Sequence, residues 1–119
     1  MAQSQTLHLI PARGLYHWKG GSSQHMLSNA SDTAKVVKIK FTDNKLYKVR
    51  PVYVVVPSKD SVGIEVCRYE GAAKEDALFI VYKNFSGANP EHEEEVKTAF
   101  ESAPGPSAQI RIPLIVSDP

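Results

Sequence analysis

Residues 37–56 read VKIKFTDNKLYKVRPVYVVV, and this stretch decides the fold. In its first part, Val37, Ile39 and Phe41 alternate with Lys38 and Lys40. Successive side chains of a β-strand point to opposite faces, so the alternation predicts a strand with one apolar and one charged face. Such a strand packs its apolar face against a core and leaves the other face open to water or to a partner.

A proline divides the second part of the stretch, Leu46–Val56. Proline has no N–H group to donate to a neighbouring strand, and it is rare inside a sheet. The break at Arg50–Pro51 therefore predicts a bend, a bulge or a strand that changes sheets. Which of these applies, and whether the Arg50–Pro51 bond is cis, stays open at the level of the sequence.

The same two-residue period continues on both sides of this stretch. Turn-forming residues such as Gly20–Gly21 and Asp43–Asn44 separate the runs. Seven or so short strands in 119 residues predict one domain over residues 1–119, an all-β antiparallel sandwich with Greek-key connections. The further strands are expected at Thr6–Ile10, Leu15–Lys19, Ser23–Asn29, Val62–Val66, Leu78–Tyr82 and Ile110–Val116.

One segment departs from the strand pattern. Asn89 can cap the N-terminus of a helix, and Pro90 suits the first helical position. From Val96 onward, apolar residues recur at helical spacing and form one apolar edge. The pattern predicts a short helix from Pro90 to about Ser102, inserted before the last strand.

Composition limits the classes of function. The 14 basic and 13 acidic residues give a net charge of +1, so no overall field favours binding to nucleic acid or to an anionic membrane. No apolar run approaches the ~20 residues of a membrane span, and the polar N-terminus lacks a secretory leader pattern. The cytosol is therefore the expected compartment. The single cysteine, Cys67, excludes an internal disulfide and a cysteine-rich zinc module.

The sequence contains no strong candidate for catalysis or metal binding. The four histidines have no metal-ligand spacing, and a solvated helix start accounts for the glutamates at 91 and 93–95. Cys67 is expected to be an ordinary half-exposed thiol. A glycine-rich phosphate loop and a nucleophile elbow are both missing from the sequence. We therefore expect no enzymatic activity, no cofactor and no metal site.

The net charge conceals two regions of opposite sign. Residues 35–59 hold seven basic residues and one acidic residue, a local charge of +6. Residues 91–101 hold five glutamates and one lysine, a local charge of −4. These regions either keep the domain soluble or act as complementary surfaces for an acidic partner or for self-association. Few aromatic residues accompany the basic strand, which argues against base stacking with RNA or DNA.

Several apolar residues fall on the outward phase of their strands, among them Phe79, Val81 and Ile115. The run Val52–Val56 is apolar on both phases. Open to water, such faces would form adhesive patches. We expect them either to be buried against the second sheet after the Pro51 bend or to form a dimer interface.

The opening stretch resembles the signature region of the major sperm protein domain, in which a Lys-x-Lys-x-Thr/Ser strand precedes a Tyr-x-Val-Arg-Pro segment. Residues 71–78, GAAKEDAL, are similar to a stretch of the small nematode sperm-specific relatives. Near the start, Ile10-Pro11-Ala12 and Ser22–His25 have the placement of the family's first strands. The resemblance covers about Leu7 to Val116, and it implies an immunoglobulin-like seven-stranded antiparallel β-sandwich.

The resemblance also implies a function. It points to a non-enzymatic, cytoplasmic protein of nematode sperm, connected with the filament cytoskeleton that drives amoeboid crawling of the pseudopod. Major sperm protein itself dimerises and polymerises without nucleotide. We therefore expect a structural or interaction protein that self-associates, for example as a homodimer, or that binds major sperm protein filaments.

A second branch of the superfamily gives an alternative. The VAMP-associated proteins use a basic strand to hold a peptide with two phenylalanines in an acidic tract. The matching positions are Lys40, Phe41 and Thr42, although Phe41 replaces a threonine and the lysine expected one strand away falls at Ala77. The alternative function is recognition of acidic peptides. The candidate binding residues are Lys38, Lys40, Thr42, Lys45 and Arg50.

Overall fold

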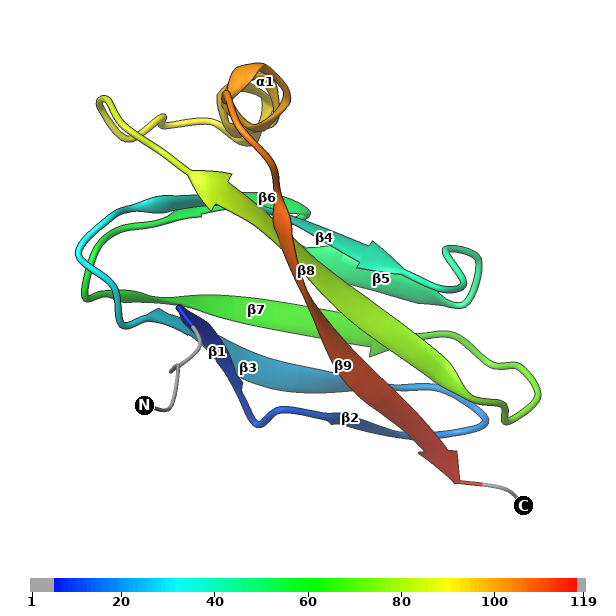
Figure 1. The fold of residues 1–119 in the computed structure, drawn as a ribbon. Coiled ribbons are helices and arrows are strands. Elements are labelled where there is room, and N and C mark those ends of the chain that lie inside the picture. The colour runs from blue at the N-terminus through cyan, green and yellow to red at the C-terminus, as the bar shows by residue number, and fades with distance from the viewer. Residues whose placement is uncertain (1–5, 118–119) are drawn as a thin grey trace.

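Two β-sheets stack face to face, and one short helix lies beside them (Figure 1). The structure is a computed structural model and describes residues 6–117. In chain order its elements are β1 (Leu7–Ile10), β2 (Gly14–His17), β3 (Gly21–Asn29), β4 (Lys35–Phe41), β5 (Tyr47–Arg50), β6 (Tyr53–Val56), β7 (Ser61–Arg68), β8 (Asp76–Asn84), α1 (Glu93–Ser102) and β9 (Ala108–Ser117).

The two sheets differ in size and in strand direction. The four-stranded sheet has the order β1-β3-β7-β5 and is antiparallel. The five-stranded sheet has the order β2-β9-β8-β4-β6, and only its β2–β9 pair is parallel. The predicted β-sandwich with a helix before the last strand is confirmed. Within residues 6–117 the chain forms nine strands where seven or so were expected, and the sheets are not antiparallel throughout.

Proline marks two places where the chain passes from one sheet to the other. β1 and β2 lie in different sheets on either side of Pro11, and β5 and β6 on either side of Pro51. The Ile10–Pro11 and Arg50–Pro51 bonds are both cis. Because proline cannot continue a ladder of hydrogen bonds, it ends one pairing and lets the next begin in the other sheet. A change of sheets is therefore the correct interpretation of the break at Pro51.

The core lies between the sheets and consists of the inward phase of each strand. Val37, Ile39 and Phe41 of β4 face it, as the alternation predicts. After the crossover, β6 turns Val54 and Val56 toward the same core. Val56 is completely buried between the sheets and Val54 is partly buried there, so neither needs a dimer interface to cover it.

The predicted helix is confirmed, but it begins later than expected. α1 starts at Glu93 with His92 as its N-cap, not at Pro90 with Asn89 as the cap. The backbone N–H of His92 donates to the Glu95 carboxylate over 3.2 Å, which closes the first turn. The three glutamates of this turn also oppose the helix dipole.

Helix α1 packs on β4 and β6 at one border of the five-stranded sheet. Val96 is its buried anchor, and the Phe100 ring lies 6.0 Å from the ring of Tyr53 on β6. Val36 of β4 is on the outward phase, yet it is completely buried, because α1 covers this part of the sheet. The helix thus hides apolar surface that the sequence pattern assigned to an open face.

Glu93 also protects the edge strand of this sheet. Its Oε2 atom accepts the backbone N–H groups of Val52 and Tyr53 over 3.1 and 3.4 Å. Free N–H groups at a sheet edge invite pairing with another chain, so this carboxylate blocks the start of β6.

No helix within residues 6–117 has the length and apolar character needed to cross a membrane.

Candidate interaction surface

The outer face of the five-stranded sheet carries cations and aromatic rings side by side. The strand register places Lys40 of β4 next to Phe79 of β8, and Phe79 next to Arg111 of β9. Two residues before Lys40 on the same face of β4, Lys38 pairs with Tyr53 of β6. The Lys38 ammonium lies 5.5 Å from the centre of the Tyr53 ring, within range of a cation–π interaction. We call these five residues the basic band.

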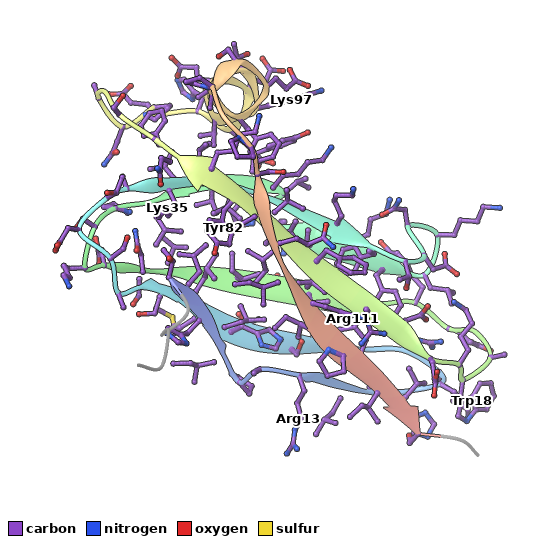
Figure 2. The ribbon with its side chains drawn as sticks, in the orientation of Figure 1. Arg13, Trp18, Lys35, Tyr82, Lys97 and Arg111 are labelled. Atoms are coloured by element: carbon purple, nitrogen blue, oxygen red, sulfur yellow. The ribbon has the colours of Figure 1, made fainter. Side chains whose placement is uncertain are left out.

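The basic band is open to a partner. Lys40 and Arg111 are exposed, whereas Lys38, Phe79 and Tyr53 are half-buried. In the part of the chain that the structure describes, none of the three cations has a carboxylate within ion-pair distance. Figure 2 shows Arg111 on β9, well separated from Lys97 on α1. The positive charge of this face is therefore not neutralised within residues 6–117.

The structure distributes the five predicted binding residues over three places. Lys38 and Lys40 lie in the basic band. Thr42 and Lys45 lie at the end of the sandwich, in the connection between β4 and β5, and the Lys45 side chain is exposed. The fifth residue, Arg50, belongs to the other sheet. Consecutive basic residues of the sequence thus reach different surfaces.

Arg50 points outward from the four-stranded sheet, because its neighbour Val49 faces the core. Its Nη2 atom lies 2.7 Å from Oε1 of Glu65 on β7, and its side chain is 83% exposed. The hydrogen bond from Arg50 holds the pKa of the Glu65 carboxyl below its usual value. Arg50 is therefore paired within the chain, unlike the cations of the basic band.

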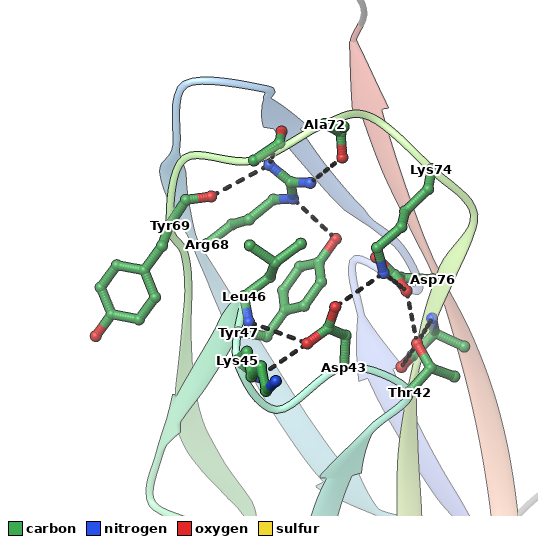
Figure 3. A network of polar contacts seen from close by, with 12 residues as sticks. Thr42, Asp43, Lys45, Leu46, Tyr47, Arg68, Tyr69, Ala72, Lys74 and Asp76 are labelled. Atoms are coloured by element: carbon green, nitrogen blue, oxygen red, sulfur yellow. Dashed lines mark hydrogen bonds and ion pairs between the residues drawn. The ribbon is translucent and has the colours of Figure 1, made fainter.

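Thr42 and its neighbours form a polar network between loops (Figure 3). The Thr42 hydroxyl donates to Asp76 over 2.9 Å and accepts the backbone N–H of Ala77 over 3.1 Å. Lys74 bridges Asp76 and Asp43, at 2.8 and 3.0 Å. The hydrogen bond to Asp76 raises the pKa of Lys74, and the hydrogen bond from Lys74 lowers the pKa of Asp43. Thr42 thus fixes the loops beside the basic band.

Arg68 is a second polar centre at this end of the sandwich (Figure 3). It is only 2% exposed, at an inward position of β7. It is surrounded by oxygen acceptors from three segments: β5, the loop after β2 and the loop after β7. The partners of its guanidinium are the Tyr47 hydroxyl at 3.1 Å and the backbone carbonyls of Trp18 at 3.1 Å, Tyr69 at 3.2 Å, Gly71 at 3.1 Å and Ala72 at 2.9 Å.

Sequence reasoning did not include Arg68, Phe79 or Arg111 among the candidate site residues. The two-residue period of the strands indicates only the direction in which these three side chains point. It places Arg68 in phase with Ile64 and Val66, and it places Phe79 and Arg111 outward. The register between β4, β8 and β9, which unites Lys40 with Phe79 and Arg111, depends on pairings between distant strands.

An exposed apolar pair lies beyond the basic band, at the β2 border of the same sheet. Leu15 of β2 pairs with Ile115 of β9, and the two residues are 57% and 49% exposed. Val81, also outward, is buried. The outward apolar residues therefore differ in burial: Val81 is buried, whereas Ile115 stays exposed and is not covered by the second sheet.

Residues 6–117 contain no cluster of three or more metal-ligating side chains.

Comparison with known proteins agrees with this architecture. The family profile described as "MSP (Major sperm protein) domain" matches residues 6–105. "Sperm-specific class P protein 31" of Caenorhabditis elegans is 33% identical over 111 residues, which cover 93% of this chain and 99% of that protein.

Two solved structures from the same nematode are also similar. WR4, a C. elegans MSP family member, has a TM-score of 0.80 at 30% identity and covers 96% of this chain and 100% of its own. SSP-19, an MSP-domain-like protein, has a TM-score of 0.75 at 27% identity and covers 90% of this chain and 97% of its own. The chain therefore belongs to the major sperm protein domain family.

Proposed function

We propose that this chain is a non-enzymatic protein of the nematode sperm cytoskeleton, which self-associates or binds major sperm protein filaments during amoeboid motility. It would act in the cytoplasm of the crawling cell, at the pseudopod. Its relatives are named as sperm-specific proteins, and this supports the proposed cell type. The observation that carries the proposal is the basic band on an open sheet face, whose three cations form no ion pair with the residues that the structure describes.

The chemistry of the basic band suits a protein partner. Arginine and aromatic residues are enriched where protein interfaces form, because they combine a large contact area with polar ends. Lys40 and Arg111 flank the half-buried Phe79, so an incoming surface meets a ring between two cations. An acidic surface with some apolar area is the complementary partner.

Co-pelleting with preformed major sperm protein filaments tests this function. We expect the wild-type chain to appear in the filament pellet, and to leave it as the salt concentration rises, because exposed ion pairs are screened. A control without filaments shows how much of the chain sediments by itself. A chain that stays in the supernatant and is also monomeric by sedimentation velocity would contradict the proposal.

Recognition of acidic peptides remains the alternative function. It is supported by the same band, because Lys38 and Lys40 lie on an outward face and form no ion pair with any other described residue, whereas Phe41 is turned into the core. The position expected to supply a further lysine, Ala77, is completely buried and adds no charge.

A titration separates this alternative from the first function. An acidic peptide with two phenylalanines should bind the wild-type chain, and the double variant Lys40→Glu/Lys45→Glu should bind it at least ~10-fold more weakly. Lys19→Glu/Lys48→Glu is the matched control, because it changes the net charge by the same amount and both lysines lie outside the basic band. Equal affinity of the wild type and the double variant would count against peptide recognition at this surface.

A further inference from the structure

Helix α1 carries carboxylates that face away from the sheet. Glu94 and Glu101 are exposed and lie seven residues apart, or about two helical turns, so they share one side of the helix. The buried Val96 is on another side, against the sheet. Glu91, just before the helix, is also exposed. Within residues 6–117, none of these three carboxylates has a cation within ion-pair distance.

We propose that the partner of the basic band is helix α1 of a second copy of this chain. This inference rests on the proposed function and specifies its self-association. The band offers the cations of Lys38, Lys40 and Arg111, and α1 offers the opposite charge. Within residues 6–117 of one molecule neither surface forms an ion pair, and each finds its complement in another copy.

Symmetry favours this pairing. In a two-fold dimer, when the band of one copy contacts α1 of the other, the reciprocal contact forms as well. One exposed ion pair contributes little, so an interface of this kind depends on repetition and on apolar contact. The rings of Phe79 and Tyr53 supply apolar area within the band. The exposed pair Leu15–Ile115 extends this area across the same sheet.

Charge-reversal variants test the inference. Lys40→Glu/Arg111→Glu makes the band acidic, and Glu94→Lys/Glu101→Lys makes α1 basic. All four side chains are exposed, so both variants should fold as the wild type does. In sedimentation velocity, we expect the wild type to dimerise and each variant alone to dimerise at least ~10-fold more weakly. A 1:1 mixture of the two variants should recover the dimer, because both contacts become complementary again.

A matched control separates the loss of a specific contact from repulsion between like net charges. Lys19→Glu/Lys48→Glu changes the net charge by the same amount as Lys40→Glu/Arg111→Glu, but it lies outside the band and α1. This control should dimerise as the wild type does. A monomeric wild type would overturn the inference, and so would variants that dimerise normally or a mixture that fails to recover the dimer.

The test also distinguishes this inference from the broader function. If the wild type is monomeric but still co-pellets with major sperm protein filaments, the dimer is wrong and the filament-binding function stands. If the charge-reversal pair recovers the dimer but no version of the chain co-pellets, the inference stands and filament binding is wrong.

Discussion

Replacing Arg68 with alanine is expected to lower the free energy of unfolding by about 3–4 kcal/mol. The guanidinium is buried and donates to five oxygens, four of them backbone carbonyls. Alanine removes all these donors and leaves buried acceptors without partners. The loops that follow β2 and β7 would then lose the group that joins them.

Denaturant unfolding measures this effect as a shift of the midpoint at constant slope. Arg111→Ala is the matched control, because it removes the same side chain from an exposed position, and its effect should stay within about 0.5 kcal/mol. Arg68→Lys keeps the charge but reaches fewer acceptors, so it should recover only part of the loss. Equal midpoints for Arg68→Ala and Arg111→Ala would contradict this role of Arg68.

Replacing Asn29 with alanine is expected to cost about 2–3 kcal/mol. Asn29 is 1% exposed, and its amide group connects the end of β3 to the end of β6 and the residue that follows it. Its Nδ2 atom donates to the carbonyls of Val56 and Pro57 over 3.0 and 3.2 Å. Its Oδ1 atom accepts the backbone N–H and the hydroxyl of Ser31 over 2.9 and 2.7 Å.

Two further variants make this prediction specific. Asn29→Asp keeps the size of the side chain but removes its N–H donors, so it should destabilise the chain nearly as much as alanine does. Asn89→Ala, at an exposed position, should have an effect within about 0.5 kcal/mol. If Asn29→Asp unfolds at the wild-type midpoint, the donors of the amide are not what stabilises this end of the sandwich.

The approximate positions of the strands can be predicted from the sequence, because a strand that buries one face carries an apolar residue at every second position. At Pro51 the sequence predicts only that the ladder breaks, because proline lacks the N–H that a ladder needs. A bend, a bulge and a change of sheets all remain compatible with that break, and the strand pairing of β5 and β6 decides between them. The start of α1 was misplaced for a local reason: the Glu95 carboxylate selects His92 as the cap, three residues beyond Asn89.

The composition of the basic band is only partly predictable from the sequence. Lys38 and Lys40 follow from the alternation in β4, but Arg50 lies on the other sheet because the chain crosses between them one residue later. Phe79 and Arg111 join the band through a register set by core packing along β8 and β9. A local pattern determines which way a side chain points, and the tertiary pairing determines its neighbours.

The most direct test of the central claim, that the basic band binds protein partners of the sperm cytoskeleton, compares three versions of the chain in filament co-pelleting. We predict that the wild type and Lys19→Glu/Lys48→Glu enter the pellet of major sperm protein filaments, whereas Lys40→Glu/Arg111→Glu stays in the supernatant. Equal pelleting of all three versions would contradict the claim, and so would the absence of all three from the pellet together with a monomeric wild type.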